Sequence, residues 1–206
     1  MPSIGHFKIY APVEPCTYSG DELREVIDKI LKDRFPEGSR ELDLQGCCIG
    51  PNGFRIVLEN ERLEQVKRLN VGGNKIKDAG AELLANASLL KKLVLLDLSA
   101  NEIGPEGIEA ICKSPHFSKL KKLVLYRNIV ANEGAKTLAS KNQMKALEEL
   151  DLAWNEIGDP GLLALAESKQ FPNLVALYMD NNFATRNAKE QAKLSPVFKN
   201  LDSLNL

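Results

Sequence analysis

The stretch LDLSANEIGPEG at residues 96–107 decides the fold, because it recurs as LDLAWNEIGDPG at residues 150–161. Only four of the twelve positions differ, and the leucines, the asparagine and the glycines are kept in both copies. The largest change puts Trp154, the only tryptophan of the chain, in the place of Ala100. The kept residues indicate a repeated structural unit, whereas no packing requirement is expected to fix the position of Ala100 and Trp154.

The two copies lie two steps apart in a 27-residue period that runs through most of the chain, and such a period is the signature of stacked repeats. An asparagine, or a cysteine in the first step, marks each repeat at Cys47, Asn74, Asn101, Asn128, Asn155 and Asn182. A glycine stands six residues later in five steps, at Gly53, Gly80, Gly107, Gly134 and Gly161. A third column of large apolar residues comprises Leu63, Leu90, Phe117, Met144, Phe171 and Phe198.

Each column predicts an element of structure. In LDLSAN, Leu96 and Leu98 face one side and Asp97 the other, as in a short strand with one buried face. After the asparagine, apolar residues such as Leu162 and Leu165 fall at helical spacing. One unit is therefore a strand, a turn and a helix, and units must stack to bury both apolar faces. We expect the asparagines to form a buried ladder that pairs backbone groups at the bend. The glycines suit either a close backbone approach or a positive φ.

This pattern resembles the leucine-rich repeat family, LxxLxLxxN/C followed by a helix. The 27-residue period and the helical second half are most similar to the ribonuclease-inhibitor type. The resemblance covers residues 39–206, as six repeats and a partial seventh. It implies an α/β fold, a right-handed solenoid with a parallel sheet on the concave face and helices on the convex face. Curvature also follows from packing widths, because strands lie about 4.8 Å apart and helices about 8–10 Å apart.

Residues 1–38 are expected to cap one end of the stack. They contain a helix over about residues 20–34. Ser19, just before it, and Glu22, in its first turn, have the spacing of a capping box. The segment HFKIY, residues 6–10, is a candidate extra strand. At the other end, Leu206 closes a seventh strand with an open edge. That edge is either tolerated, a cut in a longer chain, or a pairing surface for a second copy.

The concave face supplies the candidate binding residues. Alternation in the strands points the side chains of the later repeats into the hollow, where aromatic residues and an arginine gather as in protein interfaces. The predicted partner-binding residues are Lys122, Tyr126, Arg127, Asp151, Trp154, Tyr178 and Asp180. The alternative is that these are ordinary exposed or half-buried side chains.

Two charged columns were also weighed. Asp43, Asp97 and Asp151 lie on alternate strands, about 10 Å apart, which is too far to share a metal ion, so a solvated surface role is expected. A basic strip enters the strands and could attract an acidic protein surface, although solvated lysines at loop edges are the alternative. The strip comprises Arg40, Lys67, Arg68, Lys121 and Lys122.

Composition narrows the function classes. A net charge of −1 over 206 residues gives no whole-chain reason to bind nucleic acid or an anionic membrane. The start of the chain lacks a secretory signal pattern, and no apolar run approaches the roughly 18 residues of a membrane helix. The four cysteines show no CxxC spacing, and neither His6 nor His116 lies in a nucleophile motif. We therefore expect no metal, no cofactor and no catalysis.

The expected function is a cytoplasmic, non-catalytic scaffold that binds a protein partner of unknown identity in its hollow. A bacterial effector acting in a host cytosol has the same features. Ran GTPase-activating proteins resemble this repeat type, so a regulator of a small GTPase is the main alternative, although their acidic tail is lacking here. A self-assembling module that pairs through residues Leu201–Leu206 is a third possibility, and the chain is otherwise expected to be a monomer.

Overall fold

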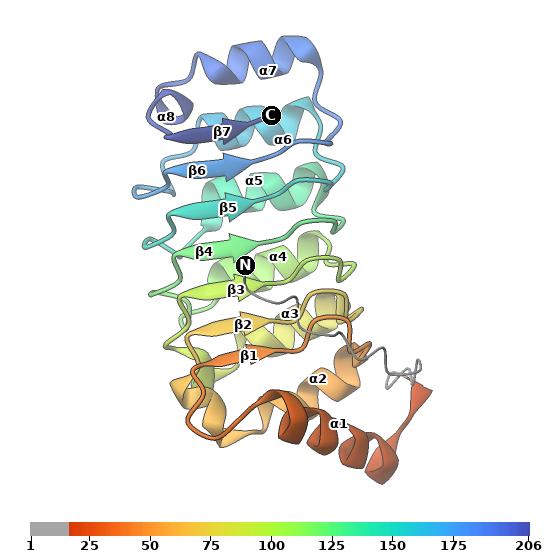
Figure 1. Ribbon diagram of the computed structural model, residues 1–206. Helices are drawn as coiled ribbons and strands as arrows, with labels where there is room; N and C mark the ends of the chain where they lie inside the picture. The colour runs from red at the N-terminus through yellow and green to blue at the C-terminus, as the bar shows by residue number, and fades with distance from the viewer. Residues whose placement is uncertain (1–16) are drawn as a thin grey trace, which may run out of the picture.

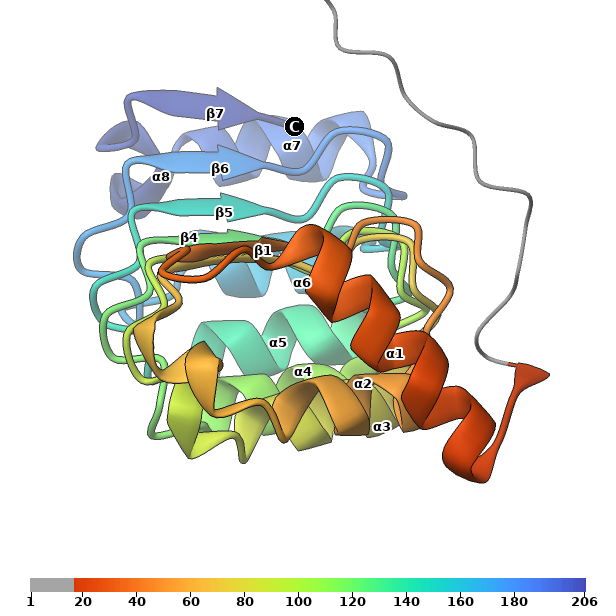
Figure 2. The ribbon, with the colours of Figure 1, turned by 60° about the horizontal axis from the view of Figure 1, so that its bottom comes forward.

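The computed structural model describes residues 17–206, and the candidate strand at residues 6–10 lies outside them. Strands line one side of the stack and helices the other (Figures 1 and 2). The strands are β1 Glu41–Asp43, β2 Arg68–Asn70, β3 Leu95–Asp97, β4 Lys122–Val124, β5 Glu149–Asp151, β6 Ala176–Tyr178 and β7 Ser203–Asn205. The helices are α1 Gly20–Arg34, α2 Gly50–Leu58, α3 Lys77–Ala85, α4 Pro105–Lys113, α5 Ala131–Lys141, α6 Asp159–Ala166, α7 Arg186–Lys193 and α8 Pro196–Lys199, with short 3-10 turns at Glu61–Gln65 and Ser88–Leu90.

The 27-residue period is the register of the sheet. All seven strands lie in one open sheet, pair in parallel and follow the order of the chain. Leu42 lies beside Leu69 at one end, and Leu177 lies beside Leu204 at the other. Each repeat therefore places the same columns side by side. The predicted fold class, a curved α/β solenoid of strand–turn–helix units with the sheet on its concave face, is confirmed.

The core runs between the two layers along the whole stack. Leu96 and Leu98 are fully buried, as the strand alternation predicts, and so are their counterparts in the other full repeats. Phe117 and Met144 close the core where each helix returns toward the next strand. The core is thus a continuous chain of equivalent layers rather than one central cluster.

The asparagine ladder forms as predicted and links each repeat to the one before it. The Nδ2 atom of Asn101 donates to the Val71 oxygen (2.9 Å) and to the Leu98 oxygen (3.0 Å). Its Oδ1 atom accepts from the backbone N–H groups of Asn74 (3.0 Å) and Ile76 (3.3 Å). Equivalent bridges between repeats recur at Asn74, Asn128, Asn155 and Asn182. The buried amides therefore pair backbone groups that the bend removes from the sheet.

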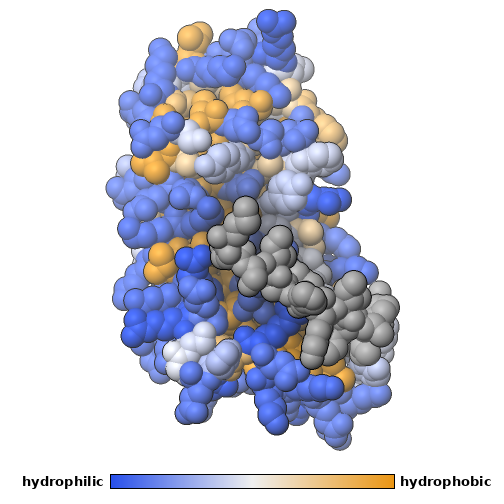
Figure 3. Space-filling model, viewed as in Figure 1, coloured by the Kyte–Doolittle hydropathy of each residue, from blue (hydrophilic) through white to orange (hydrophobic). Residues whose placement is uncertain are grey.

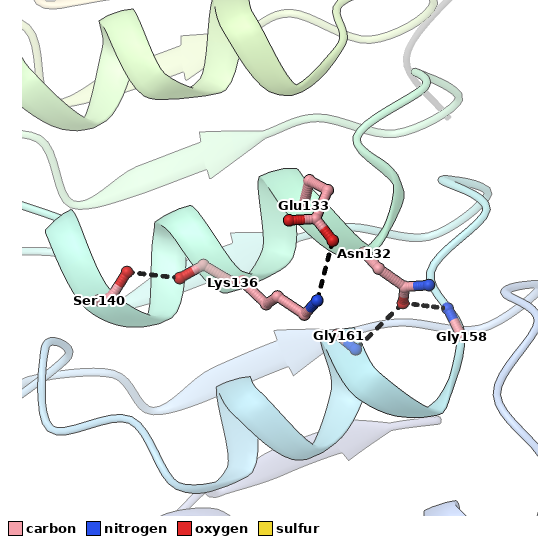
Figure 4. Close-up of polar contacts among 6 residues, drawn as sticks. All are labelled: Asn132, Glu133, Lys136, Ser140, Gly158 and Gly161. Carbon is pink, nitrogen blue, oxygen red and sulfur yellow. Dashed lines mark hydrogen bonds and ion pairs between the residues drawn. The ribbon is translucent and has the colours of Figure 1, made fainter.

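Helices α4 and α6 are capped by a residue of the preceding repeat. Asn132 Oδ1 accepts from the backbone N–H groups of Gly158 (2.9 Å) and Gly161 (3.0 Å), as Figure 4 shows. Asp78 caps α4 in the same way, at 2.7 and 2.9 Å from the two equivalent N–H groups. A cap supplied by a neighbouring repeat satisfies the N–H groups that a helix start leaves unpaired.

Helices α3 and α5 begin differently, and this explains why the fullest likeness recurs after 54 residues. Their first residues, Lys77 and Ala131, adopt left-handed backbone angles, with φ of 58° and 53°. Gly104 and Gly158, which precede α4 and α6, have extended backbone instead. The two kinds of start alternate from the second to the fifth repeat, so the same start returns only after two repeats.

The glycine column serves close packing rather than positive φ. A Cβ atom on Gly161 would lie 2.6 Å from Ile157 Cγ2 and 2.9 Å from Asn132 Oδ1. A Cβ atom on Gly80 would lie 2.4 Å from the Cβ atom of Ile76. Of the two predicted roles, the close approach is therefore the one that the structure shows.

Helix α1 leads into the stack by packing against α2. It buries Leu23, Ile27 and Leu31, and Ile27 Cδ1 lies 3.0 Å from where a Cβ atom of Gly53 would be. The predicted capping box is wrong, because Ser19 makes no side-chain cap hydrogen bond. Gly20, the first residue of the helix, has a φ of 56°. A capping box needs right-handed helical angles directly after the cap residue, and this left-handed angle departs from them.

Candidate partner-binding face

Strand alternation turns the predicted binding residues of β4, β5 and β6 to the concave face. The middle residue of each strand is buried, and the residues on either side of it in β4 and β5 are half-buried. Asp151 and Tyr178 are partners across β5 and β6. Lys122 lies opposite Glu149, and their Nζ and Oε2 atoms are 2.7 Å apart. The hydrogen bond to Glu149 raises the pKa of Lys122.

Tyr126 and Asp180 share the next column, on either side of β5. Between them stands Ala153, whose side chain is buried. The backbone remains paired here, because Arg127 N–H donates to the Ala153 oxygen at 3.0 Å. A small residue between a tyrosine and an aspartate leaves both of the larger side chains room to meet a partner.

Trp154 stands at the rim of this face, beside Arg127 of the preceding repeat. Its side chain is 50% exposed. Its φ is 59°, and that of Arg127 is 54°. Packing does not fix this position, as expected, because Ala100 and Trp154 are exposed. The backbone is constrained, however, because the chain adopts a left-handed angle here, which Gly46 and Gly73 supply in the first two repeats. The side chain is free to vary, but the backbone is not.

Two further apolar residues at the rim were missed by the sequence reasoning. Phe183 is 71% exposed and Ile129 is 46% exposed. Both follow the ladder asparagine directly, in a column where Lys75, Glu102 and Glu156 are charged. An apolar residue in a charged column was the available signal. Figure 3 shows apolar patches among the mostly hydrophilic side chains of the sheet side.

The aspartate column shapes the ends of the strands as well as facing solvent. Asp97 Oδ1 accepts from the Ser99 N–H at 2.9 Å, and Asp151 Oδ1 accepts from the Ala153 N–H at 3.0 Å. The expected role as a merely solvated surface is therefore incomplete. Burial raises the pKa of the Asp151 carboxyl, and the nearby carboxylates of Asp180 and Asp97 raise it further.

The predicted basic strip is not a continuous positive surface. Lys121 and Lys122 each lie 2.7 Å from a glutamate of the next repeat, and Arg68 lies 3.2 Å from Glu41. These glutamates stand 27 residues from their partners, in the same columns of the sheet. Three of the five cationic side chains of the strip are thus paired with glutamates of neighbouring repeats.

Residues 17–206 hold no group of three or more histidine, cysteine, aspartate or glutamate side chains placed to bind a metal ion. In the same part of the chain, no helix has the length and apolar character needed to cross a membrane. Burial raises the pKa of Cys112 to about 12, which keeps its thiol protonated at neutral pH.

Two depressions lie on the helical side rather than over the sheet. One, of about 350 Å³, is lined by residues of α1 and α2, including Arg24 and Glu59. The other, of about 470 Å³, lies between α6 and the α7–α8 segment, beside the exposed Leu194. Neither includes any of the predicted binding residues.

Comparisons with known proteins bear on the family and the fold. The family model described as leucine-rich repeat matches residues 40–54, 66–85, 90–112 and 143–166. An internalin of Listeria monocytogenes is similar in structure, with a TM-score of 0.50 and 21% identity, over 74% of this chain and 37% of that one. This chain therefore spans little more than a third of the internalin. A search of curated proteins found no match.

Two further solved structures are more distant. Leiomodin-1 actin-binding site 2 has a TM-score of 0.46 and 18% identity, over 88% of this chain and 90% of that one. A leucine-rich repeat protein of Leptospira interrogans has a TM-score of 0.31 and 19% identity, over 87% and 57%. These likenesses concern the fold and carry no argument about function. The matched repeats, the 27-residue register and the buried asparagine ladder together support a leucine-rich repeat fold for this chain.

Proposed function

We propose that this protein is a non-catalytic scaffold of the ribonuclease-inhibitor type that binds a protein partner on its concave face, over β4, β5 and β6. The observation that carries the proposal is Trp154, a half-exposed indole held at a left-handed backbone angle. That angle costs a non-glycine residue about 1–2 kcal/mol, and glycine occupies the same column elsewhere. Ala100, Arg127 and Asn181 adopt the same angle, so the angle belongs to the repeat, and it is the exposure of the large indole beside Arg127 that suggests a binding role.

The composition of the face supports a protein partner. Tyr126, Trp154 and Tyr178 stand on three successive repeats, with Arg127 at the rim. Tyrosine, tryptophan and arginine are the residues that most often anchor protein interfaces. The exposed Phe183 and Ile129 extend this apolar area along the rim. These side chains offer a partner contact area at a low cost in conformational entropy, because the sheet beneath them is rigid.

The dimensions of the face also favour a macromolecule. Seven strands spaced by about 4.8 Å extend over about 30 Å, which suits a protein interface of standard size. Small-molecule sites are usually concave clefts or cavities, and the two depressions described above lie on the helical side. Cys47, Cys48 and Cys112 are free thiols, which supports a reducing compartment such as the cytoplasm as the place where the protein acts.

The proposal is tested by affinity capture from cell lysate with the full chain and two double variants. Tyr126→Ala with Trp154→Gly removes two anchors, and glycine suits the backbone angle at position 154. Glu133→Ala with Lys136→Ala is the matched control, because it removes an exposed ion pair of α5 on the convex side (Figure 4). We expect the site variant to lose partners that the wild type and the control both recover, while all three proteins unfold at similar temperatures. Equal recovery by the three proteins would show that the partner does not bind this face.

A further inference from the structure

The charged side chains that the strands turn to the concave face are mostly acidic. In β1–β6 and the residue two places after each strand, the charged members of this face are Glu41, Asp43, Arg68, Asp97, Lys122, Glu149, Asp151 and Asp180. Six carboxylates against two cations give the face a formal charge of −4. The whole chain carries only −1, so negative charge is concentrated on this face.

Both cations among these strand residues are already occupied, while Arg127 adds one positive charge at the rim of the face. Arg68 Nε lies 3.2 Å from Glu41, and Lys122 Nζ lies 2.7 Å from Glu149. Each pair joins neighbouring strands and cancels its own charge. The aspartates are what remains, and three of them, Asp97, Asp151 and Asp180, belong to the repeats that carry or adjoin the aromatic residues.

These aspartates keep acceptor capacity for a ligand. Asp97 and Asp151 use Oδ1 for the N–H group two residues on, and Asp97 Oδ1 also accepts from the Ser99 hydroxyl at 2.6 Å. Their Oδ2 atoms accept no hydrogen bond from residues 17–206. Asp180 and Asp97 both raise the pKa of Asp151, after the larger effect of burial. A cation placed among them would relieve this repulsion, since an opposite charge favours the ionised carboxylate.

We infer that the partner presents lysine or arginine side chains to the concave face, which the free aspartates and the neighbouring aromatic rings receive together. This inference rests on the proposed function and specifies the chemistry of the partner. Ammonium and guanidinium groups bind carboxylates by charge-assisted hydrogen bonds and bind the faces of tyrosine and tryptophan rings. The face offers both kinds of acceptor around Asp151, with Tyr178 beside it and Trp154 three residues along the chain.

The charge distribution argues against the opposite kind of partner. The basic strip could attract an acidic surface, with solvated lysines as the alternative, but its Lys121, Lys122 and Arg68 are paired with glutamates. An acidic partner would face uncompensated carboxylates across the sheet, and like charges in an interface reduce affinity. Opposite charge also steers a partner toward the face and speeds association at low salt.

The inference is tested with a random peptide display library selected on the full-length protein. Asp97→Asn with Asp151→Asn and Asp180→Asn removes three charges, while the amide oxygens still accept the backbone N–H groups. The matched control, Asp21→Asn with Asp28→Asn and Asp33→Asn, removes three exposed carboxylates of α1. Selected peptides are synthesised, and their affinities are measured for the wild type, both triple variants and Trp154→Gly.

We expect peptides enriched in lysine and arginine, with affinity about tenfold weaker for the concave triple variant, unchanged for the control, and falling with salt. Basic peptides that bind the concave triple variant as tightly as the wild type would overturn the inference. Neutral or acidic peptides that require Trp154 would overturn it too, while leaving the proposed binding face intact. A selection that yields only peptides indifferent both to Trp154→Gly and to the concave triple variant would contradict the binding face itself.

Discussion

Two adjacent columns of the repeat, the ladder asparagine and the residue just before it, are constrained in opposite ways. At Asn101 and Asn128 the side chain is buried and its bonds cross to the preceding repeat. At Ala100 and Trp154 the backbone is held at a φ of 53° and 59°, and in Trp154 the side chain reaches solvent. One column requires a particular side chain and the other requires a particular backbone angle.

This difference explains how a repeat stack acquires a binding surface without losing its fold. The asparagine column can hardly change, because each amide side chain completes the hydrogen bonding of backbone groups in two repeats at once. The exposed column accepts glycine, alanine, arginine, tryptophan or asparagine, since any side chain that tolerates the angle leaves the core untouched. Binding residues can therefore vary at a local cost, while the ladder distributes any damage over neighbouring repeats.

The largest effect is expected from Asn128→Ala, which tests the bonded column. The change removes hydrogen bonds to the oxygens of Leu98 and Leu125, both at 2.9 Å, and bonds from the N–H groups of Asn101 and Ile103, both at 3.0 Å. Buried groups left unpaired cost about 1–3 kcal/mol each, so we expect a loss of about 3–5 kcal/mol in the free energy of unfolding, measured by urea denaturation.

The control for this change is Asn187→Ala, at an exposed position of α7. It is expected to alter the free energy of unfolding by no more than about 0.5 kcal/mol. A loss below about 1 kcal/mol in Asn128→Ala would mean that water replaces the amide, and the contrast between the columns would then fail.

Removal of the caps that cross between repeats should have an intermediate effect. Asp78→Ala and Asn132→Ala each leave two N–H groups at the start of the next helix without a partner. We expect losses of about 1–2 kcal/mol, with the larger loss at Asp78, whose charge also favours a helix N-terminus. Thermal unfolding compares both with Glu82→Ala, an exposed change on α3. Equal stability of all three variants would show that bonds between repeats matter little outside the ladder.

Much of the fold could be predicted because burial leaves a periodic record in the sequence. The leucine columns gave the strand phase, the 27-residue register and the position of the ladder, for instance Leu69 beside Leu96. The five glycines of their column indicated either close packing or positive φ, and the pattern alone could not separate the two. The ion pair of Lys122 and Glu149 was also readable, since the two residues lie one period apart.

The candidate site was harder to predict, for physical reasons. The sign of φ at Trp154 leaves no apolar pattern, so the sequence suggested freedom where the backbone is constrained. The cap from Asn132 depends on the direction of a side chain between repeats. The failed capping box at Ser19 shows the same limit, because spacing alone did not reveal the left-handed Gly20. Hydropathy records which side chains are buried, and it does not record backbone angles.

A smaller effect is expected in the exposed column, where the variant with the smaller residue should be the more stable one. Trp154→Gly should be more stable than Trp154→Ala by about 1 kcal/mol, because only glycine adopts a φ of 59° without cost. Both variants remove the indole, so their difference in urea denaturation isolates the backbone. Equal stability of the two would contradict the left-handed angle as the constraint on this column, and it would weaken Trp154 as evidence for binding.

The smallest expected effect concerns the charge of Asp151, beside the exposed column. Its raised pKa means that the folded protein retains the proton at pH values where the unfolded chain has lost it. The ionised carboxylate therefore costs stability near neutral pH, and the cost disappears as pH falls through the folded pKa toward the unfolded value of about 3.9.

Asp151→Asn keeps the Oδ1 acceptor for the Ala153 N–H, so it should be slightly more stable than the wild type at about pH 7. The effect is small because the hydrogen bond from the Ala153 N–H, and to a lesser degree Lys122, offset the burial of the charge. In urea denaturation this advantage should shrink between about pH 7 and pH 4, whereas the exposed change Asp28→Asn on α1 should show no such trend. An advantage that grows on acidification would mean that the aspartate is stabilised in the fold, and the acidic face would then lack the unrelieved charge that a basic partner is proposed to meet.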